Sequence, residues 1–152
     1  MPSDNFIPCT FNLYSTLHIV SIFLSYLVFL IATTTAAAYL IQDALIKSKR
    51  TGVVFSRLPD LSFLDKLNYR SISLGFTLLS LAIISGFIWA RNIHGTYWGV
   101  YNLRQIYSLV LWLIYAVILH ARLSAKLRGR KVALLSLFAF GVLVLSLLAT
   151  CR

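Results

Sequence analysis

Four stretches of the sequence are each long and apolar enough to cross a lipid bilayer as a helix. They run from about residue 17 to 40, 72 to 90, 103 to 121 and 132 to 149. A bilayer core of about 30 Å needs roughly twenty apolar residues in a helix, because every backbone amide must find its partner within the segment. The sequence therefore predicts an all-α integral membrane protein, a single domain folded as a four-transmembrane-helix bundle.

The basic residues between these stretches indicate on which side of the membrane each joint lies. Of the 14 Lys and Arg residues, eleven fall in the first and third joints, and the others are Arg91, Arg104 and Arg152. Basic loops stay on the cytoplasmic side, so we predict an N-out, C-out orientation with an external loop over residues 91–105. The segment before the first span carries Asp4 and no Lys or Arg. It lacks the basic start of a cleaved signal peptide, and we expect the first span to be retained.

A short amphipathic segment precedes the second stretch. Asp60 or Ser62 can cap a helix there, because a short polar side chain accepts a hydrogen bond from a free backbone N–H of the first turn. The apolar face of that helix would consist of Leu61, Leu64 and Leu67. Leucines at this spacing lie on one side of a helix, so we expect a short interfacial helix leading into the second span.

The charge pattern argues against several functions. The net charge of +10 is carried in short clusters between apolar runs, and the aromatic residues lie within those runs or at their edges. A nucleic-acid interface needs basic residues interleaved with exposed aromatics, so we expect no nucleic-acid partner. The four carboxylates lie outside the predicted spans, and no charge lies deep inside them. We therefore expect no hydrolytic site, no ion-coupled transport and no enzymatic activity of the chain by itself.

Several short motifs are spread over nearly the whole chain. They are Leu17-His18-Ile19-Val20, Ser25-Tyr26, Leu58-Pro59, Leu64-Asp65-Lys66-Leu67-Asn68-Tyr69-Arg70, Gly75-Phe76, Ile84-Ser85-Gly86-Phe87-Ile88-Trp89-Ala90, Gly95-Thr96-Tyr97-Trp98, Leu111-Trp112-Leu113-Ile114-Tyr115, Leu119-His120-Ala121-Arg122 and Arg128-Gly129-Arg130. Together they resemble the cytochrome c assembly family, the haem-handling membrane proteins that include CcsA, ResC and HemX.

The resemblance implies roles for two histidines. His18 matches an outward-facing histidine that serves the family as an axial haem ligand, and His120 matches a histidine near the inner face that is implicated in haem passage. Haem would be b-type and non-covalent, since the sequence has no Cys-x-x-Cys-His motif. The family also has helices before the first histidine and a second external histidine after the last helix. This sequence shows neither, so we expect a partner chain to supply those ligands.

The external loop departs from the family pattern. The family's loop is rich in tryptophan and ends in Asp-Pro-Lys-Glu, whereas here His94 replaces one tryptophan and residues 100–104 read Val-Tyr-Asn-Leu-Arg. Of the characteristic residues, Gly95, Tyr97 and Trp98 remain. The resemblance therefore implies that Tyr97 and Trp98 are the loop residues that contact haem.

The positions of the three histidines restrict which of them can share one haem. Two imidazoles must reach the iron from opposite faces of the porphyrin. His18 at the outer end and His120 near the inner end are separated by roughly 25 Å, at 1.5 Å rise per residue. His18 and His94 are both external, so a bis-histidine iron site within this chain would use that pair. Two surface histidines without any ligand are the alternative.

Other residues near the spans allow both a haem-binding and a plain membrane interpretation. Arg91 and Arg104 could pair with haem propionates, or they flank the membrane interface. His120 could instead bond lipid phosphate or a helix C-terminal carbonyl, with Arg122 snorkelling beside it. Outer aromatic residues could pack against a porphyrin face or form an ordinary aromatic belt. These aromatic residues are Trp89, Tyr97, Trp98, Tyr101 and Tyr107.

The two cysteines fall on the predicted outer side. Cys9 precedes the first span and Cys151 follows the fourth, and these spans are neighbours in an up-and-down bundle. The two residues could form a disulfide or remain free thiols, because spacing alone does not establish pairing.

Two functional hypotheses follow. The first is a haem-handling protein of cytochrome c assembly that presents His18 and the loop around Trp98 at the outer membrane face, with a second assembly protein as partner. The second is a haem-free accessory subunit of a larger respiratory or photosynthetic membrane complex, derived from the same family. Either protein would contact membrane lipids, in a bacterial inner membrane or, as the alternative, a thylakoid membrane.

Overall fold

The computed structural model describes residues 8–49, 52, 57–95, 103–124 and 129–151. Within these ranges the ordered elements are all helices, and no β-strand occurs. The helices are α1 (Pro8–Lys47), α3 (Leu61–His94), α4 (Leu103–Ser124) and α5 (Arg130–Cys151). All four are long and apolar enough to cross a membrane. The predicted all-α fold with four spans is therefore confirmed.

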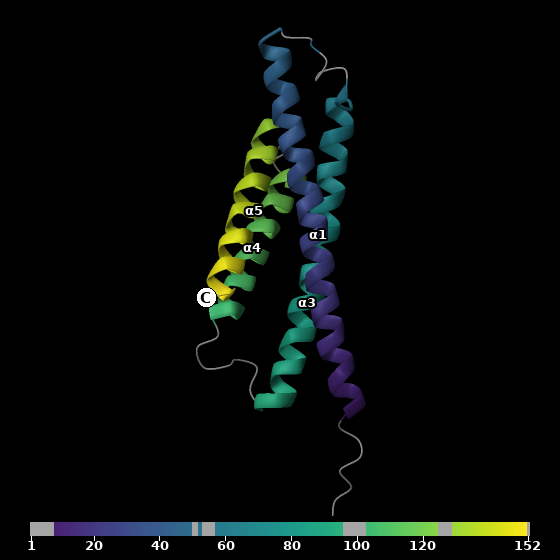
Figure 1. The fold of residues 1–152 in the computed structure, drawn as a ribbon, viewed down its shortest axis with the longest axis vertical. Coiled ribbons are helices and arrows are strands. Elements are labelled where there is room, and N and C mark those ends of the chain that lie inside the picture. The colour runs from purple at the N-terminus through teal and green to yellow at the C-terminus, as the bar shows by residue number, and fades with distance from the viewer. Residues whose placement is uncertain (1–7, 50–51, 53–56, 96–102, 125–128, 152) are drawn as a thin grey trace, which may run out of the picture.

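The four helices run alternately up and down (Figure 1). α1 and α3 form a long antiparallel pair, α5 packs on α1, and α4 packs on α5 and α3. The start of α1 and the end of α5 face the same end of the bundle (Figure 1). The helix ends that flank the two joints rich in Lys and Arg therefore share the opposite end, in agreement with the positive-inside rule. The N-out, C-out orientation itself stays a prediction.

Two of the helices are longer than a bilayer requires. α1 has 40 residues and α3 has 34, which corresponds to about 60 and 50 Å at 1.5 Å per residue. α4 and α5 have 22 residues each and measure about 33 Å, close to the thickness of about 30 Å of a hydrocarbon core. The α1–α3 pair therefore extends beyond the membrane.

The predicted interfacial helix is wrong as a separate element, because residues 61–71 are the first turns of α3. The Asn68 side chain donates a hydrogen bond to the Ala32 carbonyl of α1 at 2.7 Å. One turn further on, Ile72 is buried in the core. These contacts hold the segment upright against α1, whereas an interfacial helix would lie flat on the lipid surface.

The ends of α3 are set by local chemistry. Asp60 is the N-cap residue, as expected, but its carboxylate accepts a hydrogen bond from Ser62 Oγ at 3.0 Å and makes no bond to a backbone N–H. At the other end Gly95 has a left-handed backbone with φ 70°. This conformation, which glycine adopts without strain, lets the Gly95 N–H bond the Arg91 carbonyl at 2.9 Å and ends the helix.

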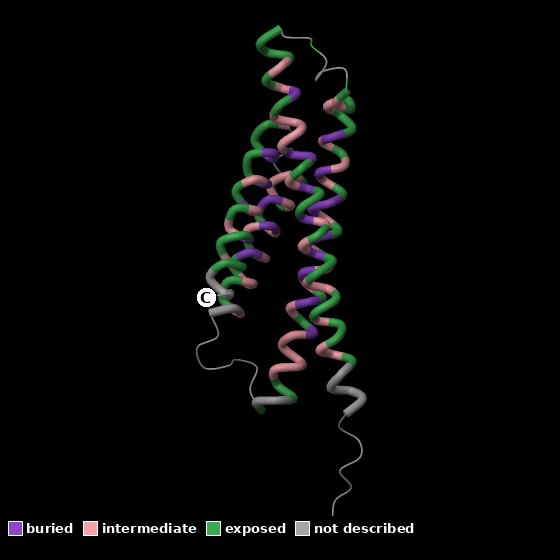
Figure 2. The backbone as a smooth tube through the Cα atoms, viewed as in Figure 1, coloured by how far each residue is buried: buried purple, intermediate pink, exposed green. Residues whose placement is uncertain are grey.

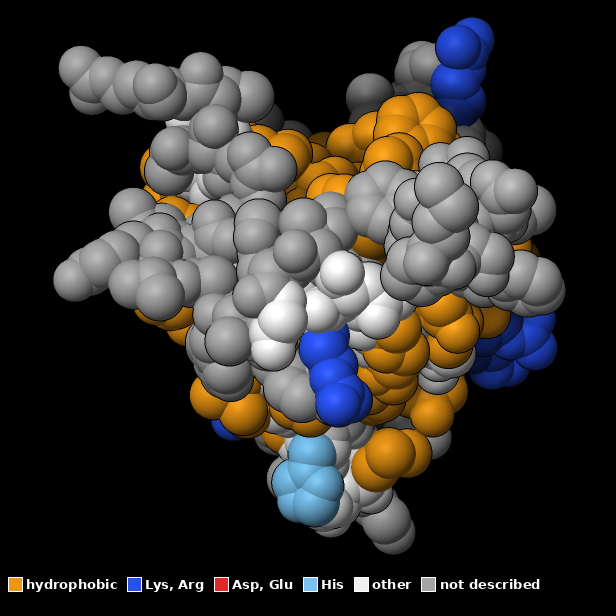
Figure 3. All heavy atoms as spheres, turned by 90° about the horizontal axis from the view of Figure 1, so that it is seen from below, with side chains coloured by type: hydrophobic (Ala, Val, Ile, Leu, Met, Phe, Trp, Pro, Cys, Tyr) orange, Lys and Arg blue, Asp and Glu red, His pale blue; other side chains and the backbone are white. Residues whose placement is uncertain are grey.

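The core lies where the helices meet, and the flanks are apolar. Buried positions follow the inner faces of the four helices (Figure 2). The rings of Phe29 and Tyr115 stack there with centroids 3.8 Å apart. Large apolar side chains such as Phe23 and Leu145 are instead exposed, and in the view along the bundle from below apolar side chains are prominent among the described residues (Figure 3). Such a surface suits lipid rather than water, in agreement with an integral membrane protein.

Candidate functional site

The His18 side chain lies at the interface between α1 and α3 rather than at the end of the bundle. It is the eleventh residue of α1, so about 15 Å of helix precedes it. Its Nδ1 is 2.7 Å from the Ala82 carbonyl oxygen of α3, and its side chain is partly buried. The expectation that His18 lies at the outer end of the first helix is therefore wrong. The reason is that α1 begins at Pro8, well before the apolar stretch does.

One face of α3 holds the His18 ring. A Cβ atom at Gly86 would lie 2.6 Å from His18 Cε1 and 2.8 Å from Nδ1, closer than such atoms approach, so glycine leaves the space that the ring occupies. The Trp89 ring lies beside it, with centroids 6.2 Å apart and an interplanar angle of 26°. Ala82, Gly86 and Trp89 follow one another at helical spacing. Together they fix the position of the imidazole.

The hydrogen bond to Ala82 determines which ring nitrogen of His18 is available. A carbonyl oxygen can only accept a hydrogen bond, so Nδ1 must carry the proton. In the neutral ring Nε2 then has a free lone pair. Within the described part of the chain Nε2 makes no hydrogen bond. A metal-binding histidine is typically held in this way, with its other N–H bonded to a carbonyl.

The other predicted haem contacts lie mostly beyond the described side chains. His94 ends α3, eight residues after Gly86, so its backbone is about 12 Å further along the helix. The side chains of His94 and Arg104 are not described, and Arg91 is exposed in the last turn of α3. The loop residues Tyr97, Trp98 and Tyr101 lie outside the described residues. The bis-histidine pair and the propionate contacts therefore stay predictions.

His120 is exposed near the inner end of α4, and its Nε2 lies 3.3 Å from Ser124 Oγ one turn further on. Arg122, two residues along, packs over the Tyr69 ring of α3 at 4.9 Å. On α3, Tyr69 lies thirteen residues before Ala82, whose carbonyl contacts His18. At 1.5 Å per residue, about 20 Å separates the two histidines along the bundle. The structure therefore keeps His18 and His120 apart.

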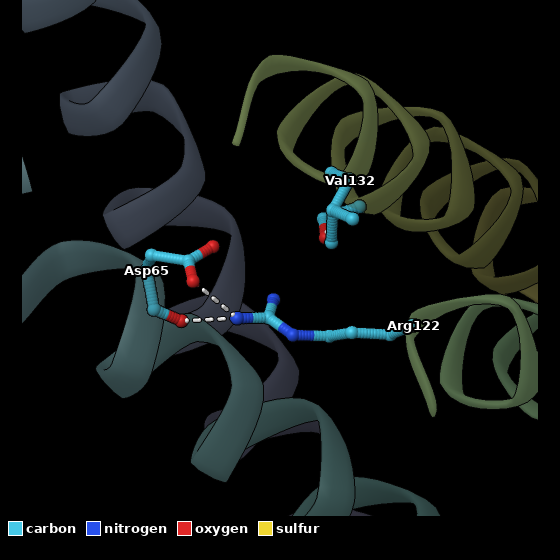
Figure 4. A network of polar contacts seen from close by, with 4 residues as sticks. Asp65, Arg122 and Val132 are labelled. Carbon is cyan, nitrogen blue, oxygen red and sulfur yellow. Dashed lines mark hydrogen bonds and ion pairs between the residues drawn. The ribbon is translucent and has the colours of Figure 1, made fainter. Parts of the chain in front are cut away.

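Arg122 forms an ion pair that the sequence interpretation missed (Figure 4). Its Nη2 lies 2.7 Å from Asp65 Oδ2 and donates to the Asp65 backbone oxygen at 2.8 Å. The Arg122 side chain is only 8% exposed and that of Asp65 20%. The expectation that Arg122 snorkels beside His120 is wrong, because an acid on the neighbouring helix draws it inward. The available signal was an acid and a cation at the inner ends of two adjacent, antiparallel spans.

The two cysteines belong to helix ends on the same side of the bundle. Cys9 lies in the first turn of α1 and Cys151 is the last residue of α5, and these helices pack on each other. Neither side chain is described, so the disulfide stays a prediction. In the part of the chain that the structure describes, no group of three His, Cys, Asp or Glu side chains could hold a metal ion.

Four spanning helices, with a histidine whose ring is fixed between two of them, define an integral membrane protein with a candidate ligand site. The sequence profile described as "Cytochrome C assembly protein" matches residues 1–150. The chain belongs to the cytochrome c assembly protein family, which confirms the resemblance seen in its motifs.

Curated relatives carry the same assignment. A Prochlorococcus marinus protein named cytochrome c biogenesis protein CcsA is 33% identical over 161 residues, covering 93% of this chain and 52% of that protein. Its namesake from Synechococcus is 42% identical over 91 residues, covering 60% of this chain and 26% of the relative. The chain thus spans about half the length, or less, of these relatives. No solved structure matches it.

Proposed function

We propose that this chain binds haem non-covalently for cytochrome c assembly, with His18 as an axial ligand of the iron. The observation that supports this role is the Nδ1–Ala82 hydrogen bond at 2.7 Å. It assigns the proton to Nδ1 and leaves the Nε2 lone pair for a metal. Haem needs only one or two side-chain ligands, because the porphyrin supplies the rest. The residues present therefore fit one axial position, and bound haem would supply the group that cytochromes c carry.

The second axial ligand is proposed to come from His94 or from another chain. His94 and His18 belong to the same half of the bundle, whereas His120 is about 20 Å away by helical rise and exposed on α4. A neighbouring assembly protein is the partner that this division of ligands suggests. The relatives come from cyanobacteria, so we place the chain in a thylakoid or inner membrane with its His18 end facing away from the cytoplasm.

The test is haem titration of the full chain purified in detergent. The wild type is expected to show the Soret band of ligated haem, and His18→Ala is expected to lose it. His120→Ala is the matched control, because it removes an exposed imidazole of the same chemistry and should retain the band. An unchanged spectrum of His18→Ala would contradict the assignment, and His94→Ala shows whether the second ligand is internal.

One observation favours a second candidate, a haem-free accessory subunit of a larger membrane complex. The external loop has lost most of the family's tryptophans and its Asp-Pro-Lys-Glu ending. Wild-type protein that stays colourless with added haem, and that purifies only together with other membrane subunits, would support this candidate over haem binding.

A further inference from the structure

Two aromatic rings of α1 meet α3 in the same geometry. His18 lies against Gly86, and Phe29, eleven residues later, lies against Gly75, eleven residues earlier on the antiparallel helix. Eleven residues make just over three helical turns, so the two residues on each helix lie on the same face. A Cβ atom would lie 2.6 Å from the nearest ring atom at either glycine. The same ring–glycine contact therefore occurs twice in the α1–α3 interface, as His18 on Gly86 and as Phe29 on Gly75.

The two contacts differ in what surrounds the ring. Phe29 is fully buried and stacked on Tyr115 of α4, so it has the environment of a core side chain. His18 is partly buried and makes a polar contact, its Nδ1–H bond to Ala82. The repeated geometry therefore serves packing at one position, and at the other it holds a ring that carries a free nitrogen lone pair.

We propose that Gly86 is a positioning residue for His18. By leaving room for the ring, Gly86 sets the tautomer and orientation of the imidazole before any ligand binds. This inference rests on the proposed function. The atoms that a Cβ would meet are Cε1 at 2.6 Å and Nδ1 at 2.8 Å, and Nδ1 is the atom bonded to the Ala82 carbonyl. A methyl group at this position displaces the ring from its acceptor, while His18 itself remains.

Loss of the bond to Ala82 has two consequences for the imidazole. The proton is no longer assigned to Nδ1, so Nε2 is no longer kept free. A ring N–H that donates to a carbonyl also raises the basicity of the other nitrogen, and loss of such a partner typically weakens metal affinity about 10–100-fold. A less basic axial ligand stabilises ferric iron less. We expect Gly86→Ala to bind haem at least about tenfold more weakly, with a more positive midpoint potential.

The first experiment is ¹⁵N NMR of the histidine rings in ligand-free chain. Wild type is expected to show His18 with its proton on Nδ1, and Gly86→Ala is expected to lose this preference. Gly75→Ala is the matched control, because it crowds Phe29 by the same distance and should keep the wild-type tautomer. Thermal unfolding of both variants reports the common packing cost. A wild-type ring protonated on Nε2 overturns the inference even if Gly86→Ala fails to fold.

The second experiment measures haem affinity and midpoint potential of the same three proteins. A change confined to Gly86→Ala supports the positioning role. If wild type binds haem and Gly86→Ala matches it in affinity and potential, the positioning role fails and the proposed function stands. If wild type binds no haem but the tautomer changes in Gly86→Ala, the proposed function fails, and Gly86 is shown to position the ring alone.

Discussion

The two halves of the α1–α3 interface, named inner and outer after the predicted orientation, are built differently. In the inner half Asn68 bonds the α1 backbone, Phe29 stacks on α4, and Arg122 of α4 reaches Asp65. In the outer half the described contacts to His18 come from α3 alone, and its ring is partly open. The difference suggests that the inner half carries most of the stability. The outer half is then able to hold a side chain for ligand chemistry at small cost to folding.

The largest effect is expected for Phe29→Ala. The ring is fully buried between Gly75 and Tyr115, so its removal leaves a cavity that costs about 3 kcal/mol. The free energy of unfolding in mixed micelles measures this loss. Phe23→Ala on the exposed face of α1 is the control and should change it little. Equal effects of the two substitutions would show that the inner half is not a packed core.

Arg122→Ala should have the next largest effect. It leaves the Asp65 carboxylate without its partner, and an unpaired buried charge costs about 3–5 kcal/mol. Because Asp65 is one-fifth exposed, we expect about 2 kcal/mol. A double-mutant cycle with Asp65→Ala isolates the pair, and Arg70→Ala, which removes an exposed cation of α3, is the control. A coupling near zero would mean that the two side chains contribute separately.

The smallest effect is expected for His18→Ala. Interhelical hydrogen bonds in membranes contribute about 0.6 kcal/mol on average, so the free energy of unfolding should fall by less than about 1 kcal/mol. The same unfolding measurement checks it. A loss as large as that of Phe29→Ala would remove the contrast between the two halves and give His18 a structural role instead.

The number and kind of helices could be predicted because that information is local. Each apolar run contains its own backbone partners, so hydropathy locates a span whatever its neighbours are. Whether the end of a helix packs on another helix is not local information, because it depends on residues far away in the sequence. Residues 61–71 carry charges typical of a membrane surface, yet Asn68 binds α1 and makes them part of α3. Hydropathy contains no signal for that contact.

The candidate site could be predicted in part. The motif around His18 singled out this histidine as the candidate ligand, but not its depth or the α3 residues that hold it. These depend on the register of α1 against α3, which Gly75 and Gly86 set through close contacts with two rings. Both glycines belong to the motifs found in the sequence, whereas their pairing with Phe29 and His18 required the packed helices. The ion pair of Arg122 was missed for the same reason.

Because α3 is one unbroken helix of 34 residues, the two ends of the protein share a single rigid rod. Arg122 contacts α3 at Asp65, in its second turn. His18 contacts the same helix about five turns later, at Ala82 and Gly86. A rotation of α3 at its Asp65 end would therefore also rotate Gly86, which contacts the imidazole of His18. Deleting or inserting one residue between these points would turn the far segment by about 100° and present a different face to His18. The number of residues between Asp65 and Gly86 is therefore constrained by these two contacts.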